Sequence, residues 1–492
     1  MKRSKFSLSN YKLFSCDMGE LVPAGLCEVL PGDSIQQATN ALVRASPLLT
    51  PVMHPVHVRI HHWFVPHRLV WDSWEDFITG GPDGMDDSVF PTINTPVSTG
   101  FAVGSLADYL GIPSGVASRP VSALPFRGYA LIYNEWYRDQ DLETRATIDT
   151  SDGVDSTTST ALQSCAWEKD YFTSSRPWEQ KGPSITIPLG TSAPVTGLGM
   201  SSQAYSTGNM YQTDGTGVLS VSRTNTGTSA VVAQQDPDNA GFPNIRADLT
   251  GVSAVTVNVL REALALQRYE EARARYGSRY IEYLRYLGVR SSDARLQRPE
   301  YLGGGTQTVQ FSEVLQTAEG TQPVGQMRGH GITSMRSNRY RRFFEEHGYV
   351  FTLLSIRPKT IYGNGLARTW TRRSKEDFWQ KELQHIGQQE VYNQEPYFAH
   401  TDPTGVFGYQ DRYDEYRRQE SSVAGEFRTS DLNFWHMARL FGSDVALNAD
   451  FVKCVPTERT FAVPSKDVFY VMAKHSIQAR RLVAGSGSSF IF

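Results

Sequence analysis

The segment PVHVRIHHWFVP, from Pro55 to Pro66, decides the fold of this chain. Its first half alternates apolar and polar side chains, in the order Val56, His57, Val58, Arg59, Ile60 and His61. Alternation with a period of two, closed by a proline at each end, predicts a β-strand with one buried and one polar face. The chain is therefore expected to build a sheet around this segment.

Further strands are predicted far along the chain. HGYVFTLLSIRP, from His347 to Pro358, is apolar on both faces, as in a strand buried inside a sandwich. Two more are predicted near the end, at RTFAVP from Arg459 and at DVFYVMAKHSI from Asp467. Because the strands flank long tracts and do not alternate with helices, the pattern favours an antiparallel β-sandwich with insertions.

Helices are predicted within the intervening tracts. The longest runs from Val259 to Val289, and its apolar stripe at steps of three and four is predicted to contain Tyr269, Ala272, Tyr276, Tyr280, Tyr283 and Leu287. Shorter helices are predicted from Ser374 to Gln389, with Ser374 as the N-cap, and around Arg412.

The composition describes a folded chain with nearly balanced charge. It has 492 residues, of which 40% are hydrophobic, with 48 basic and 51 acidic side chains. Such a charge balance is not that of a nucleic-acid-binding protein, and a genome enclosed by this protein would need other cations to neutralise its phosphates.

The N-terminus lacks the apolar core of a signal peptide, and no apolar run reaches a membrane-spanning length, so the chain is expected to stay inside the cell that makes it.

No pattern predicts a metal site, a cofactor or catalysis. Cys16, Cys27, Cys165 and Cys454 form no CxxC pair and are expected to be free, mostly buried thiols. Five histidines lie close together, namely His54, His57, His61, His62 and His67, but on a strand His57 and His61 would be roughly 13 Å apart. That separation favours core or interface histidines over metal ligands. Neighbouring carboxylates and the glycines at 303–305 have no catalytic or phosphate-loop spacing, so the chain is predicted not to be an enzyme.

Two segments are rich in aromatic residues and arginine, RGYALIYNEWYRDQD from Arg127 and CAWEKDYFTSSRPWEQKG from Cys165. Aromatic rings bury a large area and lose little side-chain entropy when they do so, and arginine forms bidentate hydrogen bonds with carboxylates. Surfaces with both residue types are therefore typical of contacts between proteins. The candidate subunit-interface rings are Tyr133, Trp136, Tyr137, Trp167, Tyr171 and Trp178.

These two segments resemble the major capsid protein of gokushovirus-like microviruses. Six further segments resemble the family in the family's order, namely LFSCDMGELVPAGLCEVLPGDSI from Leu13, VPHRLVWDSWEDFITGG from Val65, RPEYLGGG from Arg298, GHGITS from Gly329, IRPKTIYGNGLAR from Ile356 and LNFWHMAR from Leu432. The resemblance covers nearly the whole chain except Ser184 to about Thr256. It implies a mainly β fold, an antiparallel eight-stranded jelly roll with long loop and helical insertions.

The resemblance also implies a function. Many copies would close into a T = 1 icosahedral shell around a circular single-stranded DNA genome, assembled in the bacterial cytoplasm and carried in the virion. The implied partners are further copies of the chain, an internal scaffolding protein, a DNA pilot protein, a small basic DNA-binding protein and a host cell-surface receptor, without membrane insertion. The alternative is a secreted β-sandwich carbohydrate-binding module or glycoside hydrolase, in which tyrosine and tryptophan would form a sugar platform.

The tract from Ser184 to Thr256 is dominated by serine, threonine and glycine, and too few bulky groups are present for a large core. The resemblance implies a variable insertion here that forms threefold protrusions facing the host, and alternation in GVLSVSRT and SAVTVNV predicts short strands. The predicted organisation is an N-terminal arm at 1–54, the start of the jelly roll at 55–183, the insertion at 184–256, a helical and loop insertion at 257–345, and the remaining strands at 346–492 with a helical insertion near 374–440.

Two arginine clusters are candidate contacts for single-stranded DNA or for an inner interface. They lie in MRSNRYRRFF from Met335 and ARTWTRRSK from Ala367, and the candidates are Arg336, Arg339, Tyr340, Arg341, Arg342, Arg368, Trp370, Arg372 and Arg373. Proteins that bind single-stranded DNA without sequence preference use arginine side chains to contact the phosphates and aromatic rings to stack on the unpaired bases. In the alternative interpretation, these arginines pair with carboxylates of a neighbouring subunit.

Overall fold

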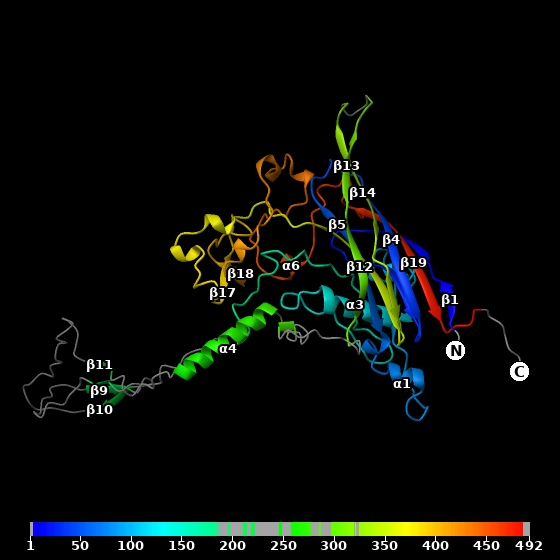
Figure 1. Cartoon of the computed structure of the whole chain (residues 1–492), viewed down its shortest axis with the longest axis horizontal. Helices are drawn as coiled ribbons and strands as arrows, with labels where there is room; N and C mark the ends of the chain where they lie inside the picture. Colours follow the sequence, from blue (N-terminus) through cyan, green and yellow to red (C-terminus); the bar gives the residue numbers. More distant parts are fainter. Residues whose placement is uncertain are drawn as a thin grey trace, which may run out of the picture. The chain divides into compact units, whose positions relative to one another are not determined.

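A computed structural model describes residues 3–183, 185, 195–196, 210–213, 218–221, 246–247, 257–276, 285–286, 297–318, 320 and 324–485. The chain divides into two compact units, one formed by Gln180–Tyr276 and the other by Met1–Glu179 with Gly277–Phe492. The predicted insertion at 184–256 falls within the smaller unit. The larger unit contains two extended antiparallel sheets (Figure 1).

The first sheet has seven strands and joins the two ends of the chain. Its order is β1 (Ser4–Ser7), β19 (Phe469–Arg481), β4 (Ser34–Ala45), β14 (Met327–Arg336) and β13 (Gln310–Leu315), with β2 (Asn10–Cys16) also paired to β19 and β15 (Tyr340–Phe343) to β4. The pairing of β19 with β4 runs from Phe469 opposite Ala45 to Arg480 opposite Ser34. The predicted strand near Asp467 is thereby confirmed.

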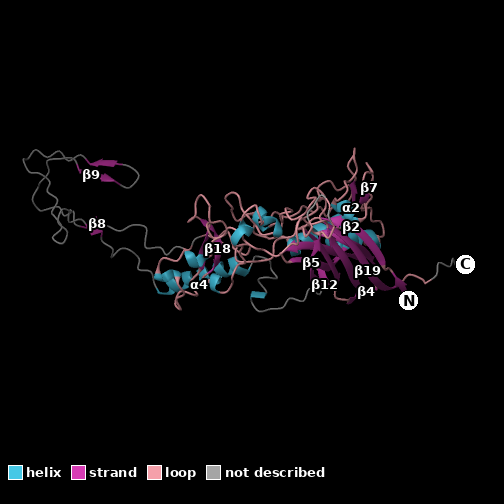
Figure 2. Ribbon diagram, turned by 90° about the horizontal axis from the view of Figure 1, so that it is seen from above, coloured by secondary structure: helices cyan, strands magenta, loops and turns pink. Residues whose placement is uncertain are grey.

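The second sheet has four strands, in the order β12 (Glu300–Thr308), β5 (Val56–Pro66), β16 (Gly348–Pro358) and β3 (Val22–Val29). β5 and β16 lie side by side at its centre, so the strands predicted at Pro55–Pro66 and His347–Pro358 are both confirmed. Figure 2 shows the strands of both sheets grouped together, with loops and short helices beyond them.

The core lies between the two sheets. Val58 of β5 and Ile356 of β16 belong to the same buried cluster as Val43 of β4 and Val471 of β19. The other face of the four-stranded sheet is also covered, because α3 (Leu124–Ile132) belongs to a second cluster with residues of β5 and β16. The four-stranded sheet is thus buried on both faces, whereas β19 of the seven-stranded sheet alternates buried and exposed residues, as expected for a sheet with one face in water.

Short elements complete the fold. The helices are α1 (Trp74–Thr79), α2 (Leu106–Leu110) and α6 (Ala449–Val452), with a π-helical turn at Tyr133–Tyr137 and 3-10 turns at His67–Leu69, Arg368–Trp370, Lys375–Asp377, Asp414–Tyr416, Gly425–Arg428 and Asn433–Trp435. Two small antiparallel pairs are formed by β6 (Thr92–Asn94) with β7 (Pro120–Ser122) and by β17 (Gln388–Tyr392) with β18 (Val406–Asp411).

The predicted mainly β sandwich with insertions is confirmed, and three local predictions are wrong. The eight predicted strands correspond to β2, β19, β4 and β14 in one sheet and β12, β5, β16 and β3 in the other, and the short strands β1, β13 and β15 extend the first sheet. RTFAVP is not a strand, since only Phe461 bridges to Leu48. The segments from Ser374 and around Arg412 form single 3-10 turns and not helices. Forming the first turn of a helix costs conformational entropy, and a short helix without a buried face makes too few favourable contacts to offset that cost. Ser374 does form the capping box of its turn.

In the smaller unit, α4 (Val257–Tyr276) confirms the long helix but not its apolar stripe. Tyr269 is 42% exposed, whereas Ala274 is fully buried and Glu270 nearly so. β9 (Met210–Thr213) and β10 (Val218–Val221) pair, which confirms a strand in GVLSVSRT, and β8 (Val195–Thr196) pairs with β11 (Arg246–Ala247). SAVTVNV ends inside α4, so its last residues are helical. The rest of the predicted insertion, and the predicted stripe positions Tyr280, Tyr283 and Leu287, lie outside the described residues.

Candidate assembly and nucleic-acid interfaces

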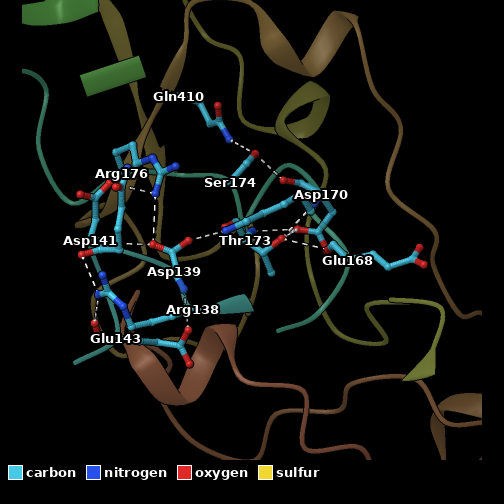
Figure 3. Close-up of polar contacts among 12 residues, drawn as sticks. Arg138, Asp139, Asp141, Glu143, Glu168, Asp170, Thr173, Ser174, Arg176 and Gln410 are labelled. Atoms are coloured by element: carbon cyan, nitrogen blue, oxygen red, sulfur yellow. Dashed lines mark hydrogen bonds and ion pairs between the residues drawn. The ribbon is translucent and has the colours of Figure 1, made fainter. Parts of the chain in front are cut away.

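The two aromatic segments are joined by a network of charged side chains (Figure 3). Arg176 Nη1 lies 3.3 Å from Asp139 Oδ1 and 3.1 Å from Asp141 Oδ2. Lys169 forms an ion pair with the other carboxylate oxygen of Asp139. Glu143 Oε2 accepts a hydrogen bond of 2.7 Å from the Asp139 backbone N–H.

The cations determine the charge state of Asp139. Burial alone would raise its pKa, but Lys169 and Arg176 outweigh that effect, so the pKa of Asp139 lies below its usual value. The carboxylate is therefore ionised at neutral pH and ties the second segment to the first within one protomer.

Most of the candidate interface rings fill this protomer's own interior. Tyr133, Trp167 and Tyr171 are each 4% exposed or less. The Tyr137 hydroxyl accepts a hydrogen bond from Trp63 Nε1 at 3.1 Å. Trp136 is half-buried beneath the guanidinium of Arg298, and Trp178 is 40% exposed.

Exposed rings lie elsewhere, in loops outside the two aromatic segments. We call the side chains of Trp370, Phe378, Trp379 and Tyr416 the aromatic loop surface, and their exposed fractions are 69%, 53%, 52% and 48%. Arg372 lies over the Tyr416 ring, 4.2 Å from its centroid. The subunit contact stays a prediction, and these rings, with Trp178, are its best-placed candidates because they are not covered by their own chain.

The first arginine cluster splits between two faces. Arg336 and Arg341 are exposed on β14 and β15, and Arg339 is exposed between those strands. Arg342 instead forms an ion pair of 3.0 Å with Glu300 of β12. Tyr340 is 8% exposed and its hydroxyl donates to Gln37 Oε1 at 2.7 Å, so its ring is not available to stack on a base.

The second cluster pairs with carboxylates of its own chain. Arg368 Nη1 lies 3.1 Å from Glu395 Oε1, and Arg372 Nη2 lies 3.4 Å from Glu415 Oε1. Burial raises the pKa of Glu395 to about 7, although the nearby Arg368 acts in the opposite direction. Trp370 and Arg373 remain exposed, so only these two members of the cluster present their side chains to a partner.

The crowded histidines are mostly core residues, as predicted. His62 is fully buried, with Nδ1 2.9 Å from Thr352 Oγ1 and Nε2 3.0 Å from Ser337 Oγ. Burial lowers its pKa to about 3, and lowers the pKa of His54 and of His67 to about 4. Across the described ranges, no three histidine, cysteine or acidic residues come together as a metal site.

Cys16, Cys165 and Cys454 are buried free thiols, and Cys27 is partly buried. Among the residues that the structure describes, no helix has the length and apolar character needed to cross a bilayer.

A two-sheet sandwich with long loops is an architecture of viral capsid proteins, and the family match identifies this chain as one of them. The chain belongs to the capsid protein (F protein) family, whose model matches residues 1–489. It is 37% identical over 486 residues to capsid protein VP1 of Bdellovibrio phage phiMH2K, covering 94% of this chain and 90% of the relative. It is 34% identical over 551 residues to capsid protein VP1 of Chlamydia phage 1 (95% and 92% covered) and 32% identical over 499 residues to capsid protein VP1 of Spiroplasma virus 4 (94% and 90% covered).

The family membership decides between the two functions that the sequence left open. The predicted resemblance to gokushovirus-like microviruses is confirmed, and the chain is a major capsid protein of a phage virion. This is a structural family and not an enzyme family, so the carbohydrate-binding or hydrolase alternative is set aside.

Proposed function

We propose that copies of this capsid protein close into a T = 1 icosahedral shell around a circular single-stranded DNA genome, and that residues 184–256 contact a receptor on the host surface. Membership of the capsid family over nearly the whole chain is the observation that carries the proposal. Closed symmetry multiplies individually weak contacts between identical subunits, so no single interface has to be strong.

The aromatic loop surface supports a subunit contact. Its four rings lie within residues 370–416 and are about half exposed or more. The Tyr416 hydroxyl lies 3.4 Å from the backbone nitrogen of Trp379, and Arg372 lies near both Tyr416 and Phe378, so these three residues are held together. Clustered aromatic residues with an arginine are typical of interface positions that contribute most of the binding energy.

The charge balance supports a separate basic partner. With 48 basic and 51 acidic side chains, the shell protein cannot neutralise a packaged genome by itself. A small basic DNA-binding protein would supply cations inside the shell. An internal scaffolding protein during assembly and a DNA pilot protein complete the proposed set of partners.

Electron microscopy and native mass spectrometry of the particles test the proposal. We expect shells of one size whose copy number matches T = 1 and which contain single-stranded DNA. Filaments, shells of another triangulation number or particles filled with duplex DNA would overturn it.

For the receptor contact, deletion of residues Thr196 to Ala240 should leave particles intact and weaken attachment to host cells. Unchanged attachment, or loss of the particles themselves, would contradict that role.

A further inference from the structure

The solvent face formed by six strands of the seven-stranded sheet carries charge of a single sign. Among the described strands, β1, β2, β4, β14, β15 and β19 contain no aspartate or glutamate. The edge strand β13 contains the exposed Glu313, but its register partner is the buried Gly329, so it belongs to the opposite face of the sheet. Apart from Arg342, which is paired with Glu300, the exposed basic side chains of the six strands are Lys5, Arg44, Arg328, Arg336, Arg341, Lys474 and Arg480, and we call these seven the basic sheet face. This face carries only positive charges although the whole chain has a formal net charge of −3.

The strand register places these side chains on one surface. Arg336 is opposite Asn40, and Asn40 is in turn opposite Lys474, so the two cations lie two strands apart. Neighbouring strands are about 4.8 Å apart, which puts the two Cα atoms roughly 10 Å from each other. The cations belong to strands that are distant in sequence, and only the pairing of the strands gathers them.

No carboxylate in the described part of the chain pairs with any of the seven. Lys474 Nζ lies over the Tyr11 ring, 5.4 Å from its centroid, and Arg328 donates to the Leu49 carbonyl at 3.4 Å. Lys5 and Arg480 are direct register partners on adjacent strands. Like charges directly opposite each other destabilise a sheet, so the isolated protomer is less stable than it would be with an anion on this face.

Exposed rings accompany the cations. Tyr11 is 65% exposed, Phe343 50% and Tyr470 46%, and each occupies an outward position on β2, β15 or β19. Basic side chains that follow a backbone, together with rings on which bases stack, are the combination used for sequence-tolerant binding of single strands. The four-stranded sheet lacks this character, because Arg59 and Arg357 there lie near the carboxylate of Glu168.

We infer that the basic sheet face binds the phosphate backbone of single-stranded nucleic acid and therefore faces the interior of the shell. The inference rests on the proposed function and adds to it which face of the sandwich meets the genome. It also revises the arginine prediction: Arg336 and Arg341 belong to the contact, whereas Arg342, Arg368 and Arg372 serve the protein's own ion pairs.

A salt titration of the full chain tests the inference. A fluorescent poly(dT) oligonucleotide of about 30 nucleotides is titrated with wild type and with the triple variant Arg336→Ala, Arg341→Ala, Lys474→Ala. A matched control removes three exposed basic side chains outside the basic sheet face and outside both arginine clusters, Arg119→Ala, Lys381→Ala, Lys466→Ala. Each lost phosphate contact on a single strand lowers the slope of log K against log salt by about 0.7, so the triple variant should lose about 2 in slope and bind at least tenfold more weakly.

The outcomes separate this inference from the proposed function. Equal losses in both triple variants, or none in the test variant, would overturn the basic sheet face while leaving a T = 1 shell with DNA intact. Test-variant chains that bind poly(dT) like wild type but no longer form particles would identify an acidic protein surface as the occupant and also overturn it. Virions of the test variant should contain less DNA per shell. Because the three side chains are exposed and none is paired with a carboxylate, the thermal midpoint of the variant should barely change, which excludes misfolding as the cause.

Discussion

Arg127 and Asp155 form an ion pair of 2.9 Å in which both side chains are completely buried. Arg127 also donates to the carbonyl oxygens of Val70 and Ser151, each at 3.0 Å. A buried charge is tolerated only when it is paired and hydrogen-bonded, and this arginine satisfies both conditions. The pair anchors α3, the helix that covers the four-stranded sheet.

Asp155→Ala should therefore destabilise the protomer severely. The substitution leaves the Arg127 guanidinium charged, buried and without its carboxylate, which costs about 3–5 kcal/mol. The free energy of unfolding, measured by denaturant titration of the unassembled chain, should fall by that amount. Asp87→Ala, at an exposed position, is the matched control and should change it by less than about 0.5 kcal/mol. Equal effects of the two substitutions would show that the buried pair has no special role.

The core histidines should make the protomer sensitive to acid. The pKa of His62 is lowered to about 3 in the folded chain and is near 6.5 in the unfolded chain, so only the unfolded chain takes up its proton between these values. Stability is then unaffected above pH 6.5 and falls below it, by about 1.4 kcal/mol per pH unit for each such histidine. Denaturant titrations at pH 7.5 and 5.5 measure this slope. It should decrease in His62→Gln. An unchanged slope in His62→Gln contradicts the prediction.

Gly304 should not tolerate a side chain. A Cβ at this position would lie 2.3 Å from the Ile60 carbonyl oxygen on the adjacent strand β5, closer than any real contact. Gly304→Ala should force β12 away from β5 and cost about 1–3 kcal/mol, visible as a lower thermal midpoint. Gly442→Ala meets open space and serves as the control. A wild-type midpoint for Gly304→Ala would mean that the two strands do not approach so closely.

The aromatic loop surface should matter for assembly and not for folding. Trp370→Ser and Trp379→Ser remove exposed rings, so the thermal midpoint of the protomer should barely change. Loss of an interface ring of this kind costs about 2 kcal/mol or more per contact, so the yield of particles in sedimentation should fall strongly. Met85→Ser removes another exposed apolar side chain and is the control for nonspecific hydrophobic association. Normal particle yields from both tryptophan variants would place the subunit contact elsewhere.

Local patterns predicted the framework of this protein well. Alternation identified β5, an apolar run identified β16, and both are central strands. The capping box at Ser374 was also predictable, but the helix expected after it was not formed, because a helix needs a buried face that only neighbouring segments supply.

The roles of particular rings and charges depended on contacts between distant segments. Trp167 and Tyr171 look like interface residues in sequence, yet they are buried by their own chain, whereas Trp370 and Trp379 are not. Arg341 and Arg342 are neighbours and both are exposed, but successive side chains of a strand point to opposite faces, so only Arg342 reaches Glu300.

The sequence alone determined the strands β5, β16 and β19, the absence of a charge excess and the capsid family, because these depend on local spacing and on recognisable segments. Only the tertiary structure decided that Lys5, Arg336 and Lys474 share one face free of carboxylates. Strand pairing brings together residues separated by hundreds of positions, and neither composition nor periodicity records which strands become neighbours.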